Sequence, residues 1–574
     1  MTTMKKILLG VMAMVAMLFT GCSNDDDNAP INGGEVSGDA VYYMSVRLSM
    51  SDATRAVTDG GYDNGTDAES KVKVANTKFY FYDQFGTYLT SGTLANDVAD
   101  ANGFMTLNAS SSDKVSHTSN PLIILGPSEK HPVYVIAVLN STVDLEGKGM
   151  SDAYKLVCDA AIGTAEGDFT MTNATYMKGD KIIYMQDIED KIYTDETTAK
   201  NNPADIYVER IVAKVAMGYN SATAPESFNV EDNYLSDNGS NFSSIKVRVK
   251  VDGWCLNTLN TQTTYLKNLN AAWNTNAPFE NWNDAFRSYW ALDNNYTSTK
   301  SPTAEGYQKT SETYTGLTYK SWDDADKNTA SVEYCYENTV DKSHQMGNPD
   351  DRTNVTTMLI AAHAEYSTDG GSNWTADVDL YKFNGVLYTL EGYTNLYLDW
   401  LKEQGYCFYK EVKDGEGNVT STEWEDFTTT NVTFTVNGID FKSVSLKLAT
   451  AAKDGFSLVK KGADDTYTET TIEAINTDIT TNFNVAKKSE CYKGGKCYYQ
   501  VPIEHLGSTA LSRFYGVVRN HSYKLVLNSI TRLGDPVYNP EAGLEYIPGE
   551  KEDYYVAARL HILKWRVVNQ IIDL

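Results

Sequence analysis

Residues 554–574 read YYVAARLHILKWRVVNQIIDL, and the rest of the sequence is best interpreted from this stretch. It is rich in β-branched, aromatic and aliphatic residues and contains neither Gly nor Pro, which is the composition of a β-strand. The apolar positions change parity between Ile562 and Trp565, which predicts a bulge or bend at Leu563 and Lys564. Beyond the bend both faces are apolar, as in a strand buried on two sides. The apolar residues of this predicted strand, which spans about 557–574, are Leu560, Ile562, Trp565, Val567, Val568, Ile571 and Ile572.

An apolar strand with a free end pairs with any open sheet edge, so we expect a site that receives it. A second candidate strand lies near the start of the chain. Residues 41–50 read VYYMSVRLSM and alternate with period two, which predicts a strand with one buried face. A polar loop with Arg55 and Ala56 follows, where a trypsin-like protease can cut. Arg47 is the competing site, but it lies inside the predicted strand. The acidic run 59–67 fits no EF-hand spacing, so we interpret it as a solvated loop.

The first residues predict export and lipidation. Lys5 and Lys6 precede an apolar run over 7–19, which is too short to span a membrane. Small residues then lead to Cys22, which resembles a bacterial lipoprotein signal cut between Gly21 and Cys22, with lipid added to Cys22. The acidic tether after Cys22 argues against electrostatic docking on anionic lipid.

Composition narrows the class of protein. The chain has 574 residues, a formal net charge of −27 and a pI near 4.7, which predicts two to four domains and argues against nucleic-acid binding. With 39 Tyr and 40 Gly against 13 Pro, it is typical of an extracellular β-protein. Six cysteines follow Cys22, and an exported protein can oxidise them. Cys491 and Cys497 flank a Gly-Gly turn and are a possible disulfide. Cysteine spacing gives only weak support for zinc, so we expect no metal site.

Many short strands separated by turn signals predict an all-β fold built of β-sandwiches. In one strand, residues 245–251, apolar and basic residues alternate strictly, as in a sheet with one solvated face. We expect a short helix over 281–290 and a domain junction near 200–205. The predicted divisions are a signal peptide (1–21), a propeptide (22–55), a first sandwich (56–204) and a second sandwich (205–574).

Enzyme motifs are lacking in the sequence. It contains no GxSxG, HExxH, P-loop or GxGxxG pattern, and its seven histidines have no nucleophile at a recognisable spacing. We therefore expect no catalytic residues and no cofactor. A glycan-binding surface lipoprotein is the alternative, because aromatic side chains can stack on sugars. The candidates for that role are Trp273, Trp282, Tyr289 and Trp290.

Motifs spread over the chain resemble those of the Bacteroidales fimbrillins, the subunits of type V pili, and in particular the Mfa1-type major fimbrial subunits. No single motif is specific, but their order makes a chance match improbable. A departure is Lys564, where many relatives have Pro. The motifs are the lipobox at Cys22, 54–56 (TRA), 79–83 (FYFYD), 169–173 (FTMTN), 208–215 (VERIVAKV), 286–291 (FRSYWA), 334–339 (YCYENT), 515–521 (YGVVRNH), 565–570 (WRVVNQ) and the final Asp573-Leu574.

The resemblance implies a fold and an assembly mechanism. It implies two transthyretin-like β-sandwich domains, delivered to the outer membrane as a lipidated precursor and then displayed as a surface fimbria that supports adhesion and virulence. An arginine-specific protease would remove the N-terminal strand, and the C-terminal strand of another subunit would fill the groove. The implied partners are copies of the chain, accessory and anchor subunits, and a host or bacterial ligand. A tip or accessory role is an alternative to the stalk.

Overall fold

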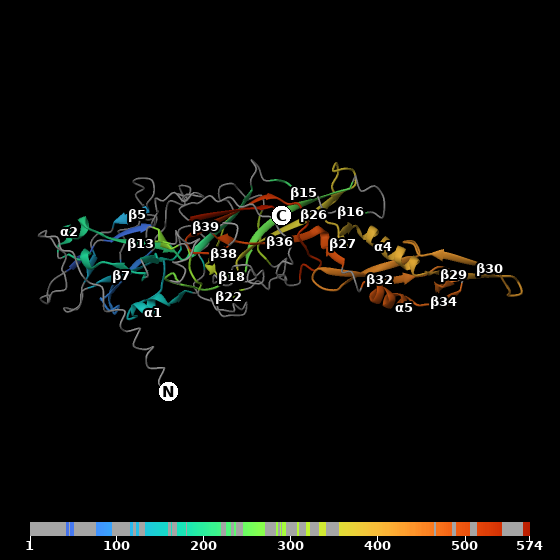
Figure 1. The fold of residues 1–574 in the computed structure, drawn as a ribbon, viewed down its shortest axis with the longest axis horizontal. Helices are drawn as coiled ribbons and strands as arrows, with labels where there is room; N and C mark the ends of the chain where they lie inside the picture. The colour runs from blue at the N-terminus through green and yellow to red at the C-terminus, as the bar shows by residue number, and fades with distance from the viewer. Residues whose placement is uncertain are drawn as a thin grey trace, which may run out of the picture.

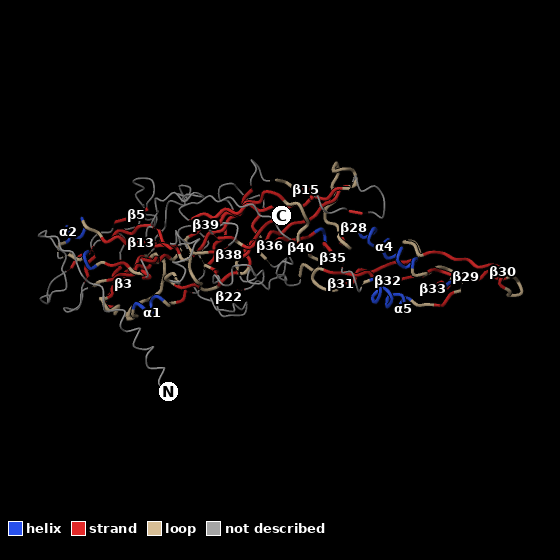
Figure 2. Tube along the Cα trace, viewed as in Figure 1, coloured by secondary structure: helices blue, strands red, loops and turns tan. Residues whose placement is uncertain are grey.

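The computed structural model describes the backbone of twenty-four segments. They are residues 42–44, 46–50, 76–93, 115–118, 122–124, 132–158, 162, 169–178, 181–193, 195–219, 225–230, 235–236, 245–269, 283–284, 287–288, 290–293, 307–308, 317–321, 332–339, 355–463, 466–484, 489–505, 514–541 and 566–573. Figure 1 shows an elongated molecule in which the described elements form an N-terminal domain, a central sandwich and a distal lobe. Figure 2 shows that strands dominate along its length. The prediction of an all-β class is confirmed.

The N-terminal domain is organised around an eight-stranded sheet with apolar cores on both faces. Phe79 and Phe81 pack into one core with Met44, whereas Tyr80 and Tyr82 enter the other, beside helix α1 (Met150–Tyr154). Adjacent residues on one strand point to opposite faces, so this aromatic run is buried on both sides. The strand order is β4 (Tyr88–Thr93), β3 (Thr77–Tyr82), β7 (Tyr134–Leu139), β9 (Met171–Asn173), β13 (Ala204–Arg210), β2 (Val46–Met50) and β5 (Val115–Thr118), and β12 (Gln186–Asp187) pairs with β7.

Shorter elements complete the N-terminal domain. Asp195 caps the first turn of helix α2 by accepting a hydrogen bond from the backbone N–H of Thr198. The remaining elements are β1 (Tyr42–Met44) paired with β6 (Leu122–Ile124), β10 (Tyr176–Lys178) paired with β11 (Lys181–Ile183), β8 (Val157–Cys158), a 3-10 turn at Glu189–Lys191, and α2 (Glu196–Asn201).

The central sandwich packs two sheets over one core. The first sheet has the order β24 (Val332–Tyr336), β14 (Val212–Tyr219), β39 (His521–Ser529) and β41 (Arg566–Asp573). The second has the order β15 (Phe228–Val230), β17 (Lys246–Asn257), β26 (Thr357–Ser367), β36 (Lys496–Pro502) and β40 (Asp535–Pro536), with β23 (Lys320–Ser321) paired to β17. Val247, Val249 and Val251 of β17 enter this core, as their alternation predicts.

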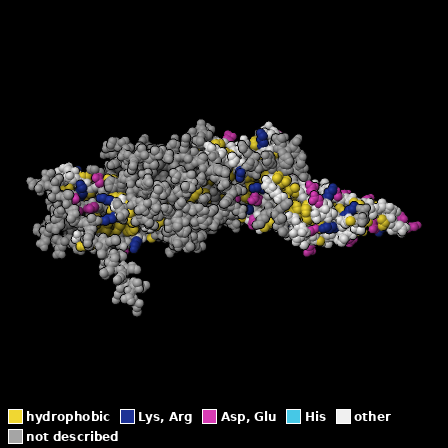
Figure 3. Space-filling model, viewed as in Figure 1, with side chains coloured by type: hydrophobic (Ala, Val, Ile, Leu, Met, Phe, Trp, Pro, Cys, Tyr) yellow, Lys and Arg dark blue, Asp and Glu magenta, His cyan; other side chains and the backbone are white. Residues whose placement is uncertain are grey.

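The distal lobe is an insertion. Strands β26 and β36 pair directly, so the chain between them leaves the sandwich and returns to it. The lobe has its own core, and Figure 3 shows acidic and basic side chains interspersed on its visible face. Its elements are β27 (Leu380–Phe383), β28 (Val386–Tyr388), α4 (Leu390–Glu403), β29 (Tyr406–Lys413), β30 (Val419–Asp426), β31 (Val432–Gly438), β32 (Ser443–Ala451), β33 (Ser457–Lys461), β34 (Tyr467–Glu469), α5 (Ile472–Asp478) followed by a π-turn at Ile479–Phe483, and β35 (Ser489–Tyr492); β16 (Leu235–Ser236) joins its six-stranded sheet.

Two expectations need correction, and the domain junction, which we expect within about fifteen residues of 200–205, can be described more closely. The segment predicted as a helix over 281–290 contains β20 (Asn283–Asp284) and β21 (Arg287–Ser288), which pair antiparallel. β13, which the predicted boundary assigns to the second domain, pairs in the N-terminal sheet, and the chain changes sheet at Ile211. Cys491 and Cys497 are both buried free thiols.

The cysteine pairing fails because the turn between the two residues connects different parts of the fold. Cys491 on β35 belongs to the core of the distal lobe, and Cys497 on β36 belongs to the core of the central sandwich. Gly494 and Gly495, both at positive φ, supply the turn. A Cβ on Gly495 would lie 2.4 Å from the carbonyl oxygen of Ala364, so only glycine fits there.

Within the described residues, no helix has both the length and the apolar character needed to cross a bilayer. The signal segment, Gly21, Cys22, Arg55 and Ala56 lie outside those residues.

Candidate functional site

The first part of the site is the position of β2 in the N-terminal sheet, which we call the N-terminal seat. β2 runs parallel to β13, with Val46 to Ser49 opposite Ala204 to Tyr207, and antiparallel to β5. Met44, two residues before β2, is fully buried in the adjoining core. The strand that the sequence marks as removable is therefore an internal strand of this sheet.

The burial pattern of β13, the strand that borders the N-terminal seat, explains why a neighbouring strand is needed there. Ala204 and Ile206 of β13 are buried in the core, whereas Asp205 and Tyr207, which alternate with them, are half-buried on the other face. Removing β2 would strip the hydrogen-bonding partner from this half of β13. An open strand edge beside an apolar core is a template for an added strand.

The second part is β41, the strand predicted from the terminal stretch. It lies parallel to β39 of its own chain, from His521 opposite Arg566 to Ser529 opposite Asp573, with an irregularity after Leu527. It occupies the end of the described four-stranded sheet. An edge strand shares one ladder with the fold and is thus easier to detach than an internal strand such as β2. Val567, Val568, Ile571 and Ile572 belong to β41, whereas Leu560, Ile562, Trp565 and the expected bend lie outside the described residues.

One nearly continuous extended segment links the two parts. β13 borders the N-terminal seat, and after Ile211 the chain continues as β14, which pairs parallel with β39, the strand that carries β41. Asn520, at positive φ, donates its backbone N–H to the carbonyl oxygen of Val212 and accepts a hydrogen bond from Arg210 through its side chain. The turn before β39 is thus attached to the break between β13 and β14.

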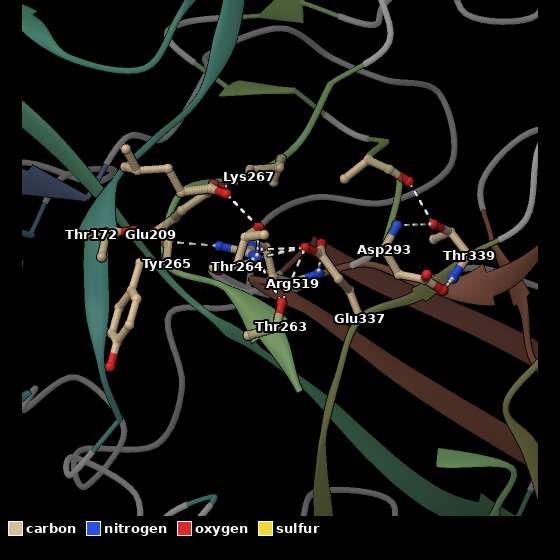
Figure 4. Close-up of polar contacts among 12 residues, drawn as sticks. Thr172, Glu209, Thr263, Thr264, Tyr265, Lys267, Asp293, Glu337, Thr339 and Arg519 are labelled. Carbon is tan, nitrogen blue, oxygen red and sulfur yellow. Dashed lines mark hydrogen bonds and ion pairs between the residues drawn. The ribbon is translucent and has the colours of Figure 1, made fainter. Parts of the chain in front are cut away.

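A buried ion pair fills the junction between the N-terminal domain and the central sandwich (Figure 4). Arg519 is fully buried, and its Nη2 lies 2.5 Å from Oε1 of Glu337, while its Nε donates to the same oxygen at 2.9 Å. Nη1 of Arg519 donates to the carbonyl oxygen of Tyr265, and Nη2 also donates to the carbonyl oxygen of Thr264 and the hydroxyl of Thr263. A buried charge needs such a complete set of partners.

A second buried ion pair joins the same region to β13. Nζ of Lys267 lies 2.7 Å from Oε2 of Glu209 and 2.9 Å from the carbonyl oxygen of Ser288, which accepts its hydrogen bond. Burial lowers the pKa of Lys267, and the carboxylate of Glu209 opposes that shift. This ion pair, together with the hydrogen bond from Arg210 to Asn520, attaches β13 to the central part of the molecule.

Neighbouring hydrogen bonds extend the junction. Thr172 of β9 donates to the carbonyl oxygen of Tyr265, and Thr339 donates its hydroxyl to Ala291 and its backbone N–H to Asp293. The motifs 169–173, 208–215, 286–291, 334–339 and 515–521, separate in the sequence, all contribute residues to this network. Sequence reasoning missed Lys267 and the strand β19 (Thr263–Thr264), because neither belongs to a recognised motif.

The remaining small strands lie around this region. Asn338 of β25 donates to the carbonyl oxygen of Thr258 and to the hydroxyl of Thr356. The small strands are β18 (Leu259–Asn260), β22 (Tyr307–Gln308), β25 (Asn338–Thr339), β37 (Glu504–His505) and β38 (Phe514–Val517).

One candidate for sugar stacking is not available for that role. Trp290 is only 1% exposed, and its ring packs 5.2 Å from the ring of His505. Trp273, Trp282 and Tyr289 lie outside the described residues.

Comparison with known proteins gives a family for the C-terminal region. Residues 490–570 match the family model described as major fimbrial subunit protein type IV, fimbrillin, C-terminal. The matched region contains β36, Arg519, β39 and the start of β41, so the similarity covers β39 and the part of β41 up to residue 570. No curated protein matches the chain.

Solved structures with detectable likeness include three fimbrial proteins. A fimbrilin (fimA) from Porphyromonas gingivalis is 13% identical, with 92% of this chain and 96% of that one covered and a TM-score of 0.33. The tip fimbrial protein Mfa3 of the same organism, with a C-terminal truncation, is 11% identical over 71% and 99% of the chains, with a TM-score of 0.25. A fimbrial assembly protein from Parabacteroides distasonis is 8% identical over 75% and 99%, with a TM-score of 0.23. Because these TM-scores lie below 0.5, none of the likenesses assigns a function or a residue role here.

Proposed function

We propose that this protein is a structural subunit of a surface fimbria and that it polymerises by donor-strand exchange. Cleavage after Arg55 removes β1 and β2, and the terminal strand of a second copy then enters the N-terminal seat. The observation that carries the proposal is the internal position of β2 between β13 and β5, because its removal opens a groove that only an added strand can close. The match of residues 490–570 to fimbrillins supports the same conclusion.

The energetics favour a durable fibre. Each apolar side chain that a donated strand buries contributes about 1.5–3 kcal/mol, and the terminal stretch offers seven such residues. Giving a strand to one neighbour and receiving one from another is a head-to-tail contact, which produces a filament when it does not close into a ring. We assign the chain to the Mfa1-type major subunits on the motifs quoted above, with accessory and anchor subunits, a processing protease and a surface ligand as its other partners.

Lipidation is the first step that can be tested. Replacing Cys22 by Ala should abolish incorporation of radiolabelled palmitate and prevent delivery of the precursor to the outer membrane, because the thiol is the acceptor of the lipid. Surface filaments should be lost with it. The Ser23→Ala variant is the matched control and should be labelled normally. Normal filaments on cells that carry only the Cys22→Ala variant would contradict the lipid route.

Proteolytic cleavage after Arg55 is the second step that can be tested. N-terminal sequencing of purified filaments should find Ala56 as the first residue, since Arg55 lies in a polar loop that a protease can reach. Cutting at Arg47 would leave Leu48 and Met50 attached and occupying part of the N-terminal seat. The Arg55→Lys variant should remain uncut by an arginine-specific protease, whereas Arg47→Lys should be cut as the wild type is. Filament subunits that begin at Leu48 would show that the protease cuts after Arg47 instead.

Electron microscopy of purified filaments, combined with that sequencing, tests the function itself. We expect unbranched fibres composed of the processed chain. A processed chain that stays monomeric on the cell surface and binds glycans would instead support the alternative function.

A further inference from the structure

The removable strand and the terminal strand share a pattern around an arginine. Arg47 follows Val46 and precedes Leu48, and Arg566 follows Trp565 and precedes Val567. In the N-terminal seat, Arg47 lies directly opposite Asp205 of β13. Residues opposite one another in neighbouring strands project on the same face, so the register places an arginine and an aspartate as cross-strand neighbours.

We propose that the terminal strand of a second copy enters the N-terminal seat in one register, with Arg566 opposite Asp205, Val567 opposite Ile206 and Val568 opposite Tyr207. Asp205 is thereby the residue that selects the register. The proposal rests on the proposed function and adds to it the polarity and the alignment of the incoming strand.

The polarity follows from both strand ladders. β2 is parallel to β13 and antiparallel to β5, so a replacement that restores both ladders must run as β2 does. β41 already forms a parallel ladder with β39 in its own chain. The strand can therefore pass from its own sheet to the neighbour's while keeping the same kind of hydrogen bonding.

Burial along β13 excludes registers that differ by one residue. Ala204 is 1% exposed and Ile206 is fully buried, so residues opposite them point toward an apolar core. A slip by one residue in either direction would turn Arg566 toward this core, where an unpaired charge is costly. The charge must lie opposite Asp205 or Tyr207, which are half-buried on the other face.

Only the carboxylate distinguishes registers that differ by two residues. A slip in one direction would place Arg566 opposite Tyr207 and bring Lys564 opposite Asp205. Arginine pairs with a carboxylate through two parallel hydrogen bonds, whereas lysine offers a single charged centre. Because Asp205 lies opposite an arginine in the precursor, we expect the same position in the filament to favour Arg566 over Lys564.

A disulfide experiment between two subunits reads the register directly. One cleaved subunit carries Ser116→Cys or Thr118→Cys on β5, which lie opposite Ser49 and Arg47 in the precursor, and a second carries Val568→Cys or Lys564→Cys, so Asp205 and Arg566 stay intact. Opposite residues in neighbouring strands lie about 5 Å apart, within the range of a disulfide, whereas a two-residue offset adds about 6.6 Å along the strand and exceeds it. The six cysteines of the described residues are buried and will not compete. Mixed filaments are oxidised, and covalent dimers are counted on denaturing gels.

The mixture of Ser116→Cys with Val568→Cys should give at least about tenfold more dimer than Thr118→Cys mixed with Val568→Cys or with Lys564→Cys. Dominant linkage of Thr118→Cys to Lys564→Cys or to Val568→Cys would overturn the register while leaving strand exchange intact. Filaments that form without a cross-link in any mixture would overturn the register and the assignment of the N-terminal seat. If wild-type cleaved subunits form no filament at all, the proposed function fails.

A second experiment reverses the charges at positions 205 and 566. The Asp205→Arg subunit should accept the wild-type strand roughly tenfold more slowly, because two like charges would face each other, and a donor with Arg566→Asp should restore the rate. Asp187→Arg on β12, outside the seat, is the control and should polymerise normally. Thermal melting of each monomer checks that it is folded. Equal rates for all pairings would overturn the role of Asp205.

Discussion

A chain that lacks residues 565–574 should fold, become lipidated and be cut, yet form no filament. The deletion removes β41, which occupies the end of the described central sheet and pairs there with β39. The backbone groups of β39 that it uncovers can bond to water, so the unfolding temperature should fall by only a few degrees. Loss of the donated strand, in contrast, removes every subunit-to-subunit ladder. Electron microscopy and size-exclusion chromatography of the cleaved protein measure the outcome.

The matched control shortens a surface feature far from both parts of the site. Residues 414–418 form the turn between β29 and β30 at the tip of the distal lobe, and replacing them with Asn-Gly should leave polymerisation unchanged. A synthetic peptide of residues 557–574 should bind the cleaved, truncated monomer and not its uncleaved precursor. A truncated chain that fails to fold would show that β41 is an ordinary core strand.

The strands were predictable where one local pattern decides the structure. The alternation in 245–251 matches the burial of Val247, Val249 and Val251, and the terminal stretch contains β41. The single strand predicted over 41–50 is divided into β1 and β2, which pair in different sheets. Their partners could not be predicted. Period two says that a strand has a buried face, but it does not say that β2 pairs with β13 across more than 150 residues of intervening chain.

The distal lobe shows what the search for strands overlooked. Tyr393, Tyr397 and Leu401 are buried at i, i+4 and i+8 on α4, and Thr389 caps the helix by accepting a hydrogen bond from the backbone N–H of Gly392. This spacing and this cap are a helix signal that the sequence does contain. The free thiols of Cys491 and Cys497 had no such signal, because the turn between them separates two cores that only the tertiary structure defines.

The ion pairs of the junction were not predictable either. Lys267 and Arg519 look like ordinary surface cations in the sequence, and their partners Glu209 and Glu337 lie 58 and 182 positions away. The motifs that contain three of these four residues resemble those of a family, yet nothing in the motifs says that they meet. Their convergence supports a physical explanation for these motifs, which is that they build the joint between the N-terminal domain and the central sandwich.

Replacing Arg519 by Ala should be the most damaging single substitution in the described part of the molecule. It leaves the carboxylate of Glu337, which is 1% exposed, without its cation, and it also removes hydrogen bonds to Thr263, Thr264 and Tyr265. Breaking a buried pair by removing one partner costs about 3–5 kcal/mol, a large share of the stability of an ordinary domain. Urea denaturation followed by tryptophan fluorescence measures the loss.

Two further variants separate the ion pair from a general effect of losing a charge. Lys402→Ala breaks an ion pair with Asp426 in which both side chains are more than half exposed. The urea concentration at the midpoint of unfolding of this variant should therefore hardly change. Arg519→Met combined with Glu337→Leu removes both charges and should recover much of the stability lost in Arg519→Ala, because no uncompensated charge then remains buried. If the recovered double variant folds but its cleaved subunits polymerise slowly, the pair holds the two domains in the geometry that strand exchange needs. A single variant as stable as the wild type would show that the junction contributes nothing.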